Sequence, residues 1–146
     1  MKFLNRAINI LLVEDSRTDV ILMKKMLSML NTPSQVEVAD DGVEAIAFLR
    51  KENKYQTKTR PDLIILDLNL PRKSGHEVLV EIKNDLILRV IPIIILSTSD
   101  SEKDILRCYE NYANCYITKP MSLKDFQQQI KIIEDFWFNV AHYPSE

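Results

Sequence analysis

Polar side chains that could do chemistry follow four of the apolar runs of this chain. Two adjacent acids, Glu14 and Asp15, follow the first run, and Asp67 follows the third. Ser97 follows the fourth run, and Lys119 follows the fifth. Carboxylates that gather without histidine or cysteine suit Mg²⁺, which prefers hard oxygen ligands, and a lysine serves a phosphate as a point charge. Carboxylates also accept phosphoryl groups, so this set predicts a Mg²⁺ site that carries a phosphoryl group on or beside a carboxylate.

The runs that would position these side chains alternate with helical patterns. The predicted strands are Ile8–Val13, Val36–Ala39, Leu63–Leu66, Ile91–Leu96 and Cys115–Ile117. The predicted helices, from apolar residues at helical spacing, are Arg17–Leu30, Gly42–Lys51, Gly75–Asn84, Ser101–Tyr109 and Leu123–Val140. Five such units predict an α/β, flavodoxin-like (βα)5 doubly wound parallel sheet with strand order 2-1-3-4-5. In that sheet a ligand lies beyond the carboxyl ends of the first and third strands, where Glu14, Asp15 and Asp67 fall.

Composition excludes several other classes of function. The 146 residues suit one domain, and 19 Lys and Arg against 21 Asp and Glu leave a net charge of −2. A slightly acidic chain lacks the basic footprint of a nucleic-acid-binding protein. The two glycines, Gly42 and Gly75, are too few and too far apart for a Gly-rich nucleotide loop.

The same reading predicts a cytoplasmic protein. The N-terminus lacks the pattern of a secretory signal, and the longest apolar run, Val90–Leu96, is too short to span a membrane. Cys108 and Cys115 suggest neither a disulfide framework nor a metal site, so we expect two buried or idle thiols. The polar stretch Lys51–Arg60 looks like one surface loop.

These residues, in this chain order, resemble the receiver domain of two-component response regulators. The resemblance covers nearly the whole chain and implies one receiver domain over residues 1–146, with a core of about residues 8–138 and no output domain. It implies that Asp67, in the run of residues 67–71, is the phosphoacceptor. Glu14 and Asp15 match the family's metal-binding pair, and Asn69 would offer its backbone carbonyl to the same Mg²⁺.

The resemblance extends to the switch residues. Ser97 matches the hydroxyl residue that moves toward the phosphoryl group, Tyr116 matches the aromatic switch, and Lys119 matches the family's lysine. Lys119 and Pro120 match a Lys-Pro pair that is often joined by a cis bond. The family's partner would be a histidine kinase, and phosphorylation would change a protein-interaction face instead of releasing a product, so the protein would not be an enzyme beyond its own phosphorylation and dephosphorylation.

A narrower resemblance points to the single-domain regulators paired with cyanobacterial phytochromes. It rests on residues 114–119, on the long loop 51–60 and on Phe136 and Trp137. It implies a phytochrome-type light sensor as the kinase. Two positions depart from the common pattern: Tyr112 stands where many members have glycine, and Thr98 stands where a smaller residue is frequent.

The final predicted helix carries two apolar stripes about 100° apart. The first consists of Leu123, Phe126, Ile130, Ile133 and Trp137, and the second of Ile132, Phe136 and Val140. One stripe suffices for docking on the sheet. The second needs a cover, either the chain's own tail or a second copy, and we favour a homodimer through the face of the fourth helix, fifth strand and fifth helix that the family resemblance suggests.

Three alternatives stay open at this stage. A small phosphohydrolase could use Asp67 as its nucleophile, although such enzymes want an acid where Asn69 stands. A relay intermediate could pass the phosphoryl group to another histidine. A scaffold would need none of the acid, hydroxyl and lysine set. His76 and His142 show no partner in the sequence, and we expect both on the surface.

Overall fold

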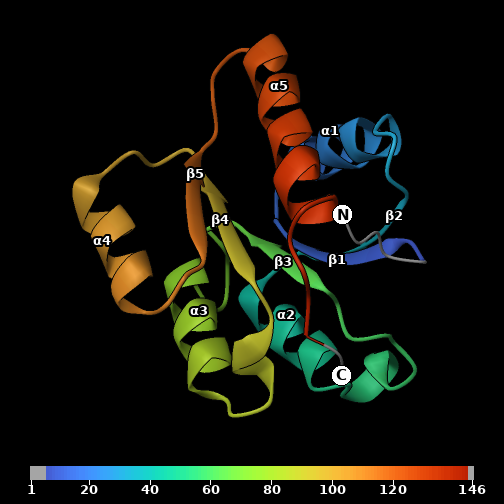
Figure 1. Cartoon of the computed structure of the whole chain (residues 1–146). Coiled ribbons are helices and arrows are strands. Elements are labelled where there is room, and N and C mark those ends of the chain that lie inside the picture. The colour runs from blue at the N-terminus through green and yellow to red at the C-terminus, as the bar shows by residue number, and fades with distance from the viewer. Residues whose placement is uncertain (1–5, 145–146) are drawn as a thin grey trace.

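The computed structural model describes residues 6–144 as a five-stranded parallel sheet with helices on both faces (Figure 1). The strands are β1 (Ile8–Val13), β2 (Ser34–Ala39), β3 (Leu63–Leu66), β4 (Ile93–Ser97) and β5 (Cys115–Thr118). Their order is β2-β1-β3-β4-β5, which confirms the predicted flavodoxin-like topology. β1 and β3 are neighbours although α1, β2 and α2 separate them in sequence, so the strand order switches between them.

The helices are α1 (Arg17–Ser28), α2 (Gly42–Leu49), α3 (Gly75–Asn84), α4 (Glu102–Glu110) and α5 (Leu123–Ile133). Each begins after a capping residue whose side chain accepts the backbone N–H of the residue three positions on; the caps are Ser16, Asp41, Ser74, Ser101 and Ser122. In Figure 1, α1 and α5 lie on one face of the sheet and α2 and α3 on the other, while α4 lies beside the β5 edge. No helix among residues 6–144 is long and apolar enough to cross a membrane.

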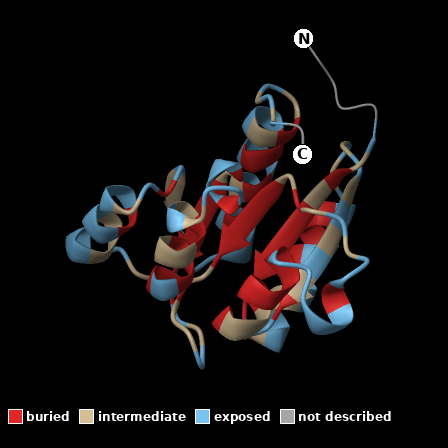
Figure 2. Cartoon of the chain, turned by 90° about the horizontal axis from the view of Figure 1, so that it is seen from below, coloured by how far each residue is buried: buried red, intermediate tan, exposed pale blue. Residues whose placement is uncertain are grey.

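Two apolar cores fill the two faces of the sheet, and the inner strands β1, β3 and β4 between them are almost wholly buried (Figure 2). Successive residues of a strand face opposite sides, so Leu11 and Val13 join the core under α2 and α3, while Ile10 and Leu12 join the core under α1 and α5. β3 and β4 are buried at every position, as expected for strands covered on both faces. This packing fixes the strand ends that bear the polar residues.

The stretch Lys51–Arg60 is more ordered than a polar surface loop. Asn53–Tyr55 forms a 3₁₀ turn, and a second one spans Leu88–Val90. Tyr55 is buried against Phe48 at 5.3 Å between ring centroids, and its hydroxyl donates to Glu44. One aromatic residue therefore anchors the loop to α2.

The predicted helix Leu123–Val140 is wrong beyond residue 133. The chain continues from α5 into a π-helical segment, Glu134–Phe138. A π-turn holds more residues than an α-turn, which changes the residue that faces inward: Phe138 is buried, and Trp137 is only partly buried. Leu123, at the start of the expected docking stripe, is exposed.

The second stripe stays on the surface. Ile132, Phe136 and Val140 are 61, 52 and 56% exposed. The tail does pack back on the core, since Tyr143 contacts it and donates its hydroxyl to the carbonyl of Trp137. The tail leaves the side chains of Ile132, Phe136 and Val140 exposed to solvent.

Candidate functional site

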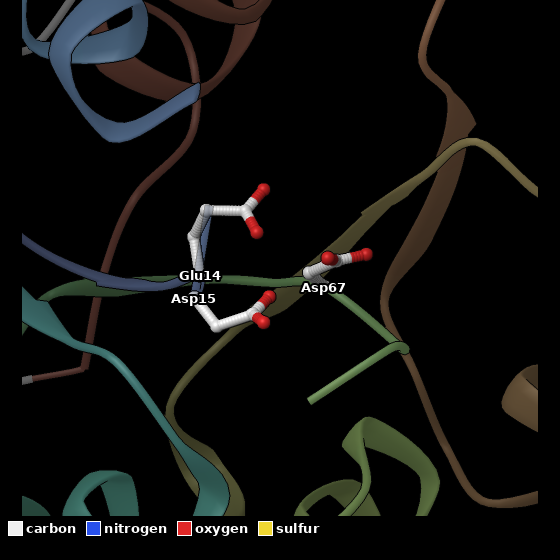
Figure 3. A group of neighbouring side chains, drawn as sticks. All are labelled: Glu14, Asp15 and Asp67. Carbon is white, nitrogen blue, oxygen red and sulfur yellow. The ribbon is translucent and has the colours of Figure 1, made fainter. Parts of the chain in front are cut away.

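The carboxylates of Glu14, Asp15 and Asp67 lie close together at the carboxyl ends of β1 and β3 (Figure 3). One oxygen from each lies within 4.8 Å of the others. The pairing of Val13 with Leu66 in parallel register places the residues that follow them, Glu14 and Asp67, side by side. The side chain of Glu14 is buried and that of Asp15 is exposed. Three like charges at this distance need a cation or a proton to neutralise them.

Lys119 supplies one positive charge to this group. Its Nζ lies 2.5 Å from Glu14 Oε1 and 3.2 Å from Asp19 Oδ2, and its side chain is almost wholly buried. Burial alone would lower the pKa of Lys119, but the hydrogen bond to Glu14 and the charges of Asp67, Glu14 and Asp19 outweigh it and raise the pKa above the ordinary value. The lysine is therefore a fixed cation at the site.

Burial disfavours the charged form of Glu14. Burial raises its pKa above the ordinary value of a glutamate. The hydrogen bond from Lys119 opposes this, and the nearby charge of Asp67 adds to it. Crowding of Glu14 and Asp67 is thus only partly relieved by Lys119, which leaves the open side of the cluster suited to a cation.

Asp67 has one oxygen held and one free for chemistry. Its Oδ1 accepts the backbone N–H of Leu68 at 2.8 Å, and no hydrogen bond reaches Oδ2 from the described residues. The loop that follows bends back on Asp67, because the N–H of Gly75 donates to the carbonyl of Leu68 at 2.9 Å. Asn69 lies in this loop with an exposed side chain.

Ser97 ends β4 and is fully buried. Its Oγ accepts the backbone N–H of Ser99 at 3.2 Å, and its carbonyl accepts the N–H of Lys119 at 2.7 Å. The hydroxyl is thus engaged with the loop between β4 and α4. Thr98 is exposed beside it. The peptide bond between Lys119 and Pro120 is trans, as are all bonds of the described residues, although the family's Lys-Pro pair is often joined by a cis bond.

Tyr116 links β5 to the same loop. Its hydroxyl donates to the carbonyl of Ser99 at 2.8 Å, and its ring packs against the core under α2 and α3. Its backbone N–H donates to the hydroxyl of Tyr109 on α4. Burial alone fits either of two roles for Tyr116, a packing aromatic of the strand or a switch residue. The bond to Ser99 adds the connection to the β4–α4 loop that a switch needs.

Asp19 and His76 belong to the site or its surroundings and were missed, as was Ser99. Asp19 contacts Lys119 from the first turn of α1, and an acid one turn after Asp15 was the available signal. His76 is buried, against our expectation, with Nε2 3.2 Å from Asp104 Oδ1 and Nδ1 3.7 Å from Cys108 Sγ. His142 is exposed, as expected, and Cys108 and Cys115 are both free thiols.

The residues present fit a divalent cation. The donors are carboxylate oxygens on two adjacent strand ends, and the exposed Asp15 keeps one side open to solvent. A site with few protein oxygens and room for water and a phosphoryl oxygen is typical of Mg²⁺ and similar ions. Lys119 occupies the opposite side, against Glu14 and Asp19.

Comparison with known proteins agrees with this arrangement. The family model of the response regulator receiver domain matches residues 10–131. Response regulator Rcp1 of Synechocystis sp. is 43% identical over 136 residues, which cover 93% of this chain and 92% of Rcp1.

Solved structures give the same likeness. The phosphorylated cyanobacterial phytochrome response regulator RcpA superposes with a TM-score of 0.92 at 47% identity and covers 96% of this chain and 100% of its own. The Mn²⁺-bound form of Rcp1 superposes with a TM-score of 0.89 at 42% identity, covering 94% of this chain and 99% of its own. One of these similar proteins is thus known with a phosphoryl group and the other with a divalent metal ion.

Proposed function

Because this chain belongs to the response regulator receiver family, we propose that Asp67 is its phosphoacceptor and that a histidine kinase is the donor. The observation that carries the proposal is the position of Asp67, which lies beside Glu14 and Asp15 at the switch point and has Oδ2 free. The phosphorylated RcpA structure and the matched family favour this role over that of a phosphohydrolase.

In the proposed reaction the carboxylate of Asp67 attacks the phosphorus of a phosphohistidine in line with the leaving group. An O–P bond forms as the N–P bond breaks, and the electron pair leaves with the imidazole nitrogen. The ammonium group of Lys119 would then leave Glu14 and pair with a phosphoryl oxygen, which would help to neutralise the new dianion. The protein keeps the phosphoryl group, so we class it as a switch and not as an enzyme, apart from its own phosphorylation and dephosphorylation.

The cation proposed for this site is Mg²⁺. Glu14, Asp15 and Asp67 would hold it through side-chain oxygens and Asn69 through its backbone carbonyl. A bound cation would supply charge neutralisation for the developing phosphoryl negative charge. The Mn²⁺-bound Rcp1 structure supports a divalent ion in a similar protein.

Ser97 and Tyr116 are the proposed switch residues. A phosphoryl group on Asp67 would attract the Ser97 hydroxyl away from the N–H of Ser99, and Tyr116 is bonded to the same Ser99 through its carbonyl. A change at Ser97 therefore acts on the loop that Tyr116 contacts. The output would be a changed interaction face formed by α4, β5 and α5.

The likeness to RcpA and Rcp1 favours a phytochrome-type light sensor as the kinase partner, and the protein would act in the cytoplasm, where kinases use ATP. We further propose a homodimer through the α4–β5–α5 face and the chain after α5, with neither nucleic acid nor membrane as a partner. The exposed side chains of Ile132, Phe136 and Val140 support a second copy as their cover. A monomeric elution profile at high micromolar concentration, with and without a phosphoryl mimic, would contradict the dimer.

Phosphoryl transfer tests the central proposal. The protein is incubated with Mg²⁺ and labelled acetyl phosphate or a labelled kinase, and we expect about one acid-stable, base-labile label per chain. Label retained in Asp67→Asn would overturn the assignment, and sustained turnover of a phosphomonoester would favour the hydrolase. Onward transfer to a phosphotransfer histidine protein would identify a relay intermediate.

A further inference from the structure

The first turn of α3 is built against the backbone of the proposed phosphoacceptor. A Cβ at Gly75 would lie 2.2 Å from the carbonyl oxygen of Asp67 and 2.5 Å from Leu68 Cα, so only glycine allows this approach. The N–H of Gly75 also donates to Leu68. A shift in the segment after Asp67 would therefore displace Gly75 and the next residue, His76.

His76 carries this contact across to α4. Its side chain is 10% exposed, and its two ring nitrogens face two residues one turn apart on α4. Nε2 lies 3.2 Å from Asp104 Oδ1, and Nδ1 lies 3.7 Å from Cys108 Sγ. A neutral ring with its proton on Nε2 satisfies both contacts, because it donates to the carboxylate and accepts from the thiol. A protonated ring also satisfies Asp104.

Asp104 passes the connection to the switch loop. Its second oxygen accepts the hydroxyl of Ser99 at 2.6 Å, and the carbonyl of Ser99 accepts the hydroxyl of Tyr116 at 2.8 Å. The hydrogen bond from Ser99, followed by that from His76, lowers the pKa of Asp104, which keeps it a carboxylate. One continuous path of contacts thus runs from His76 to Tyr116.

Apart from the hydroxyl of Tyr109, which accepts the backbone N–H of Tyr116, α4 has few other contacts that hold it in place. Cys108 is its one buried residue, and Leu106 and Tyr109 are exposed. By contrast, α3 buries Gly75, His76, Val78, Leu79 and Ile82. Elements with few buried contacts are the ones that move in switching proteins. The position of α4 therefore depends strongly on the contacts of Cys108 and Asp104, and His76 makes both.

We propose that His76 is a positioning residue of the switch, which fixes α4 through Asp104 and couples the state of Asp67 to the α4–β5–α5 face. The inference rests on the proposed function of Asp67. In it, α3 responds to the phosphorylated segment through Gly75, and His76 transmits the change to Asp104, Ser99 and Tyr116. Without His76, Asp67 would still accept a phosphoryl group, but α4 would respond less.

Cys108 offers a direct readout of α4, because it is buried only while α4 lies against α3. Burial and then the charge of Asp104 raise its pKa to about 11, so the docked thiol reacts slowly. In a Cys115→Ser background, the alkylation rate of Cys108 is measured with Mg²⁺ alone and with Mg²⁺ plus beryllofluoride, a phosphoryl mimic. We expect the mimic to change the rate by about fivefold or more.

Three variants in that background test the coupling. His76→Leu keeps the apolar volume and removes both hydrogen bonds, so the rate should become nearly independent of the mimic. His76→Gln, which can still donate to Asp104, should restore part of the response, a rescue that simple space filling would not give. His142→Ala removes the exposed histidine and should behave as the background. If His76→Leu does not fold, Asp104→Asn replaces it, and it should show the same loss of response.

The outcomes separate this inference from the proposed function. Absence of label on Asp67 in the parent protein overturns the proposed function itself. Label on Asp67 with a Cys108 rate that ignores the mimic in the parent, or a full response that persists in His76→Leu, overturns the role of His76 alone. Label in every variant, with the response lost in His76→Leu and partly restored in His76→Gln, supports it.

Discussion

The ammonium group of Lys119 lies 2.5 Å from Glu14 Oε1, and this contact joins the end of β5 to the end of β1 across the carboxylate cluster. Both side chains are almost fully buried, so neither charge can be satisfied by water if the other is removed. The pair holds Lys119 beside Asp67 before any phosphoryl group arrives. It also makes the acids that would bind a cation dependent on the lysine for their stability.

Replacing Lys119 by methionine should therefore destabilise the protein in metal-free buffer. Loss of one partner of a buried pair leaves Glu14 uncompensated, and we expect the free energy of unfolding to fall by about 3 kcal/mol. Urea denaturation checks this value. Added Mg²⁺ should recover more stability in the variant than in the parent, because it neutralises the same acids. Lys24→Met, at an exposed position of α1, should change little, and an equal loss in both variants would contradict the role of the pair.

Asp15 should behave as a metal ligand without being a structural residue. It is exposed and lies within 4.8 Å of two other acids, so Asp15→Asn removes repulsion and should leave metal-free stability unchanged or slightly higher. A cation at a hundred times its Kd stabilises by about 2.7 kcal/mol, and a tenfold weaker site loses about 1.4 kcal/mol of this. Thermal melts over a Mg²⁺ titration measure the difference. Asp100→Asn, at an exposed acid outside the cluster, should keep the full shift.

Tyr112 has a left-handed backbone conformation at a position where the sequence departs from the common receiver pattern. It ends the turn after α4 with φ of 69°, the left-handed region, where many family members have glycine. A non-glycine residue in this conformation lowers the free energy of unfolding by about 1 to 2 kcal/mol. Replacing it by glycine recovers only part of this, because glycine loses more conformational entropy on folding. Tyr112→Gly should raise the free energy of unfolding by about 1 kcal/mol in urea. Asn111→Gly, at a φ of −98°, should lower it instead.

The elements that local patterns define were predictable, and those that depend on distant contacts were not. The strands Ile8–Val13 and Leu63–Leu66 are continuous apolar runs, and the structure has them at the predicted bounds. The predicted end of the final helix was wrong, because a π-helical segment follows α5 there, and its buried acid, Glu134, accepts the backbone N–H of Thr32, 102 residues away in sequence. No periodicity within the helix contains that contact.

The site follows the same division. Glu14, Asp15, Asp67 and Lys119 could be placed because parallel strands bring their carboxyl ends to one edge. His76 could not, because its partners lie on another helix, and a histidine in an amphipathic pattern gives no sign of them. Ser99 was missed for a similar reason, since its part depends on Asp104 and Tyr116 together.

The contact of Glu134 with Thr32 should make the stability of the C-terminal segment depend on pH. Burial alone would raise the pKa of Glu134, but hydrogen bonds from Lys131 and Thr32 outweigh it and lower the pKa below 4.5. A lowered folded pKa contributes stability above the unfolded value and loses it as the pH falls through the folded one. Glu134→Gln should thus cost about 1 to 2 kcal/mol at pH 7, and the difference from the parent should vanish at a pH below the folded pKa.

Urea denaturation at several pH values measures this difference, with Asp135→Asn as the control. Asp135 also pairs with Lys131 but is well exposed, so its loss should cost little. A difference for Glu134→Gln that stays constant as the pH falls would contradict the charge of Glu134 as the cause.

The only two glycines of the chain hold the two ends of the loop that follows Asp67. Neither has a positive φ, so the reason for glycine is space and not conformation. A Cβ at Gly75 would lie 2.2 Å from the carbonyl oxygen of Asp67, and one at Gly42 would lie 2.1 Å from that of Lys73. Backbone atoms must move in either case, and each Gly→Ala variant should lose about 1 to 3 kcal/mol of stability.

The two variants should differ in function. Gly75→Ala displaces Asp67 itself, so it should slow uptake of label from acetyl phosphate. Gly42→Ala displaces Lys73, at the far end of the loop, and should lose stability with a smaller effect on labelling. Urea denaturation and the initial labelling rate, measured on the same preparations, separate the two effects. Equal slowing in both variants would mean that the loop moves as one body and that its attachment to α2 matters to the phosphoacceptor as much as its attachment to α3.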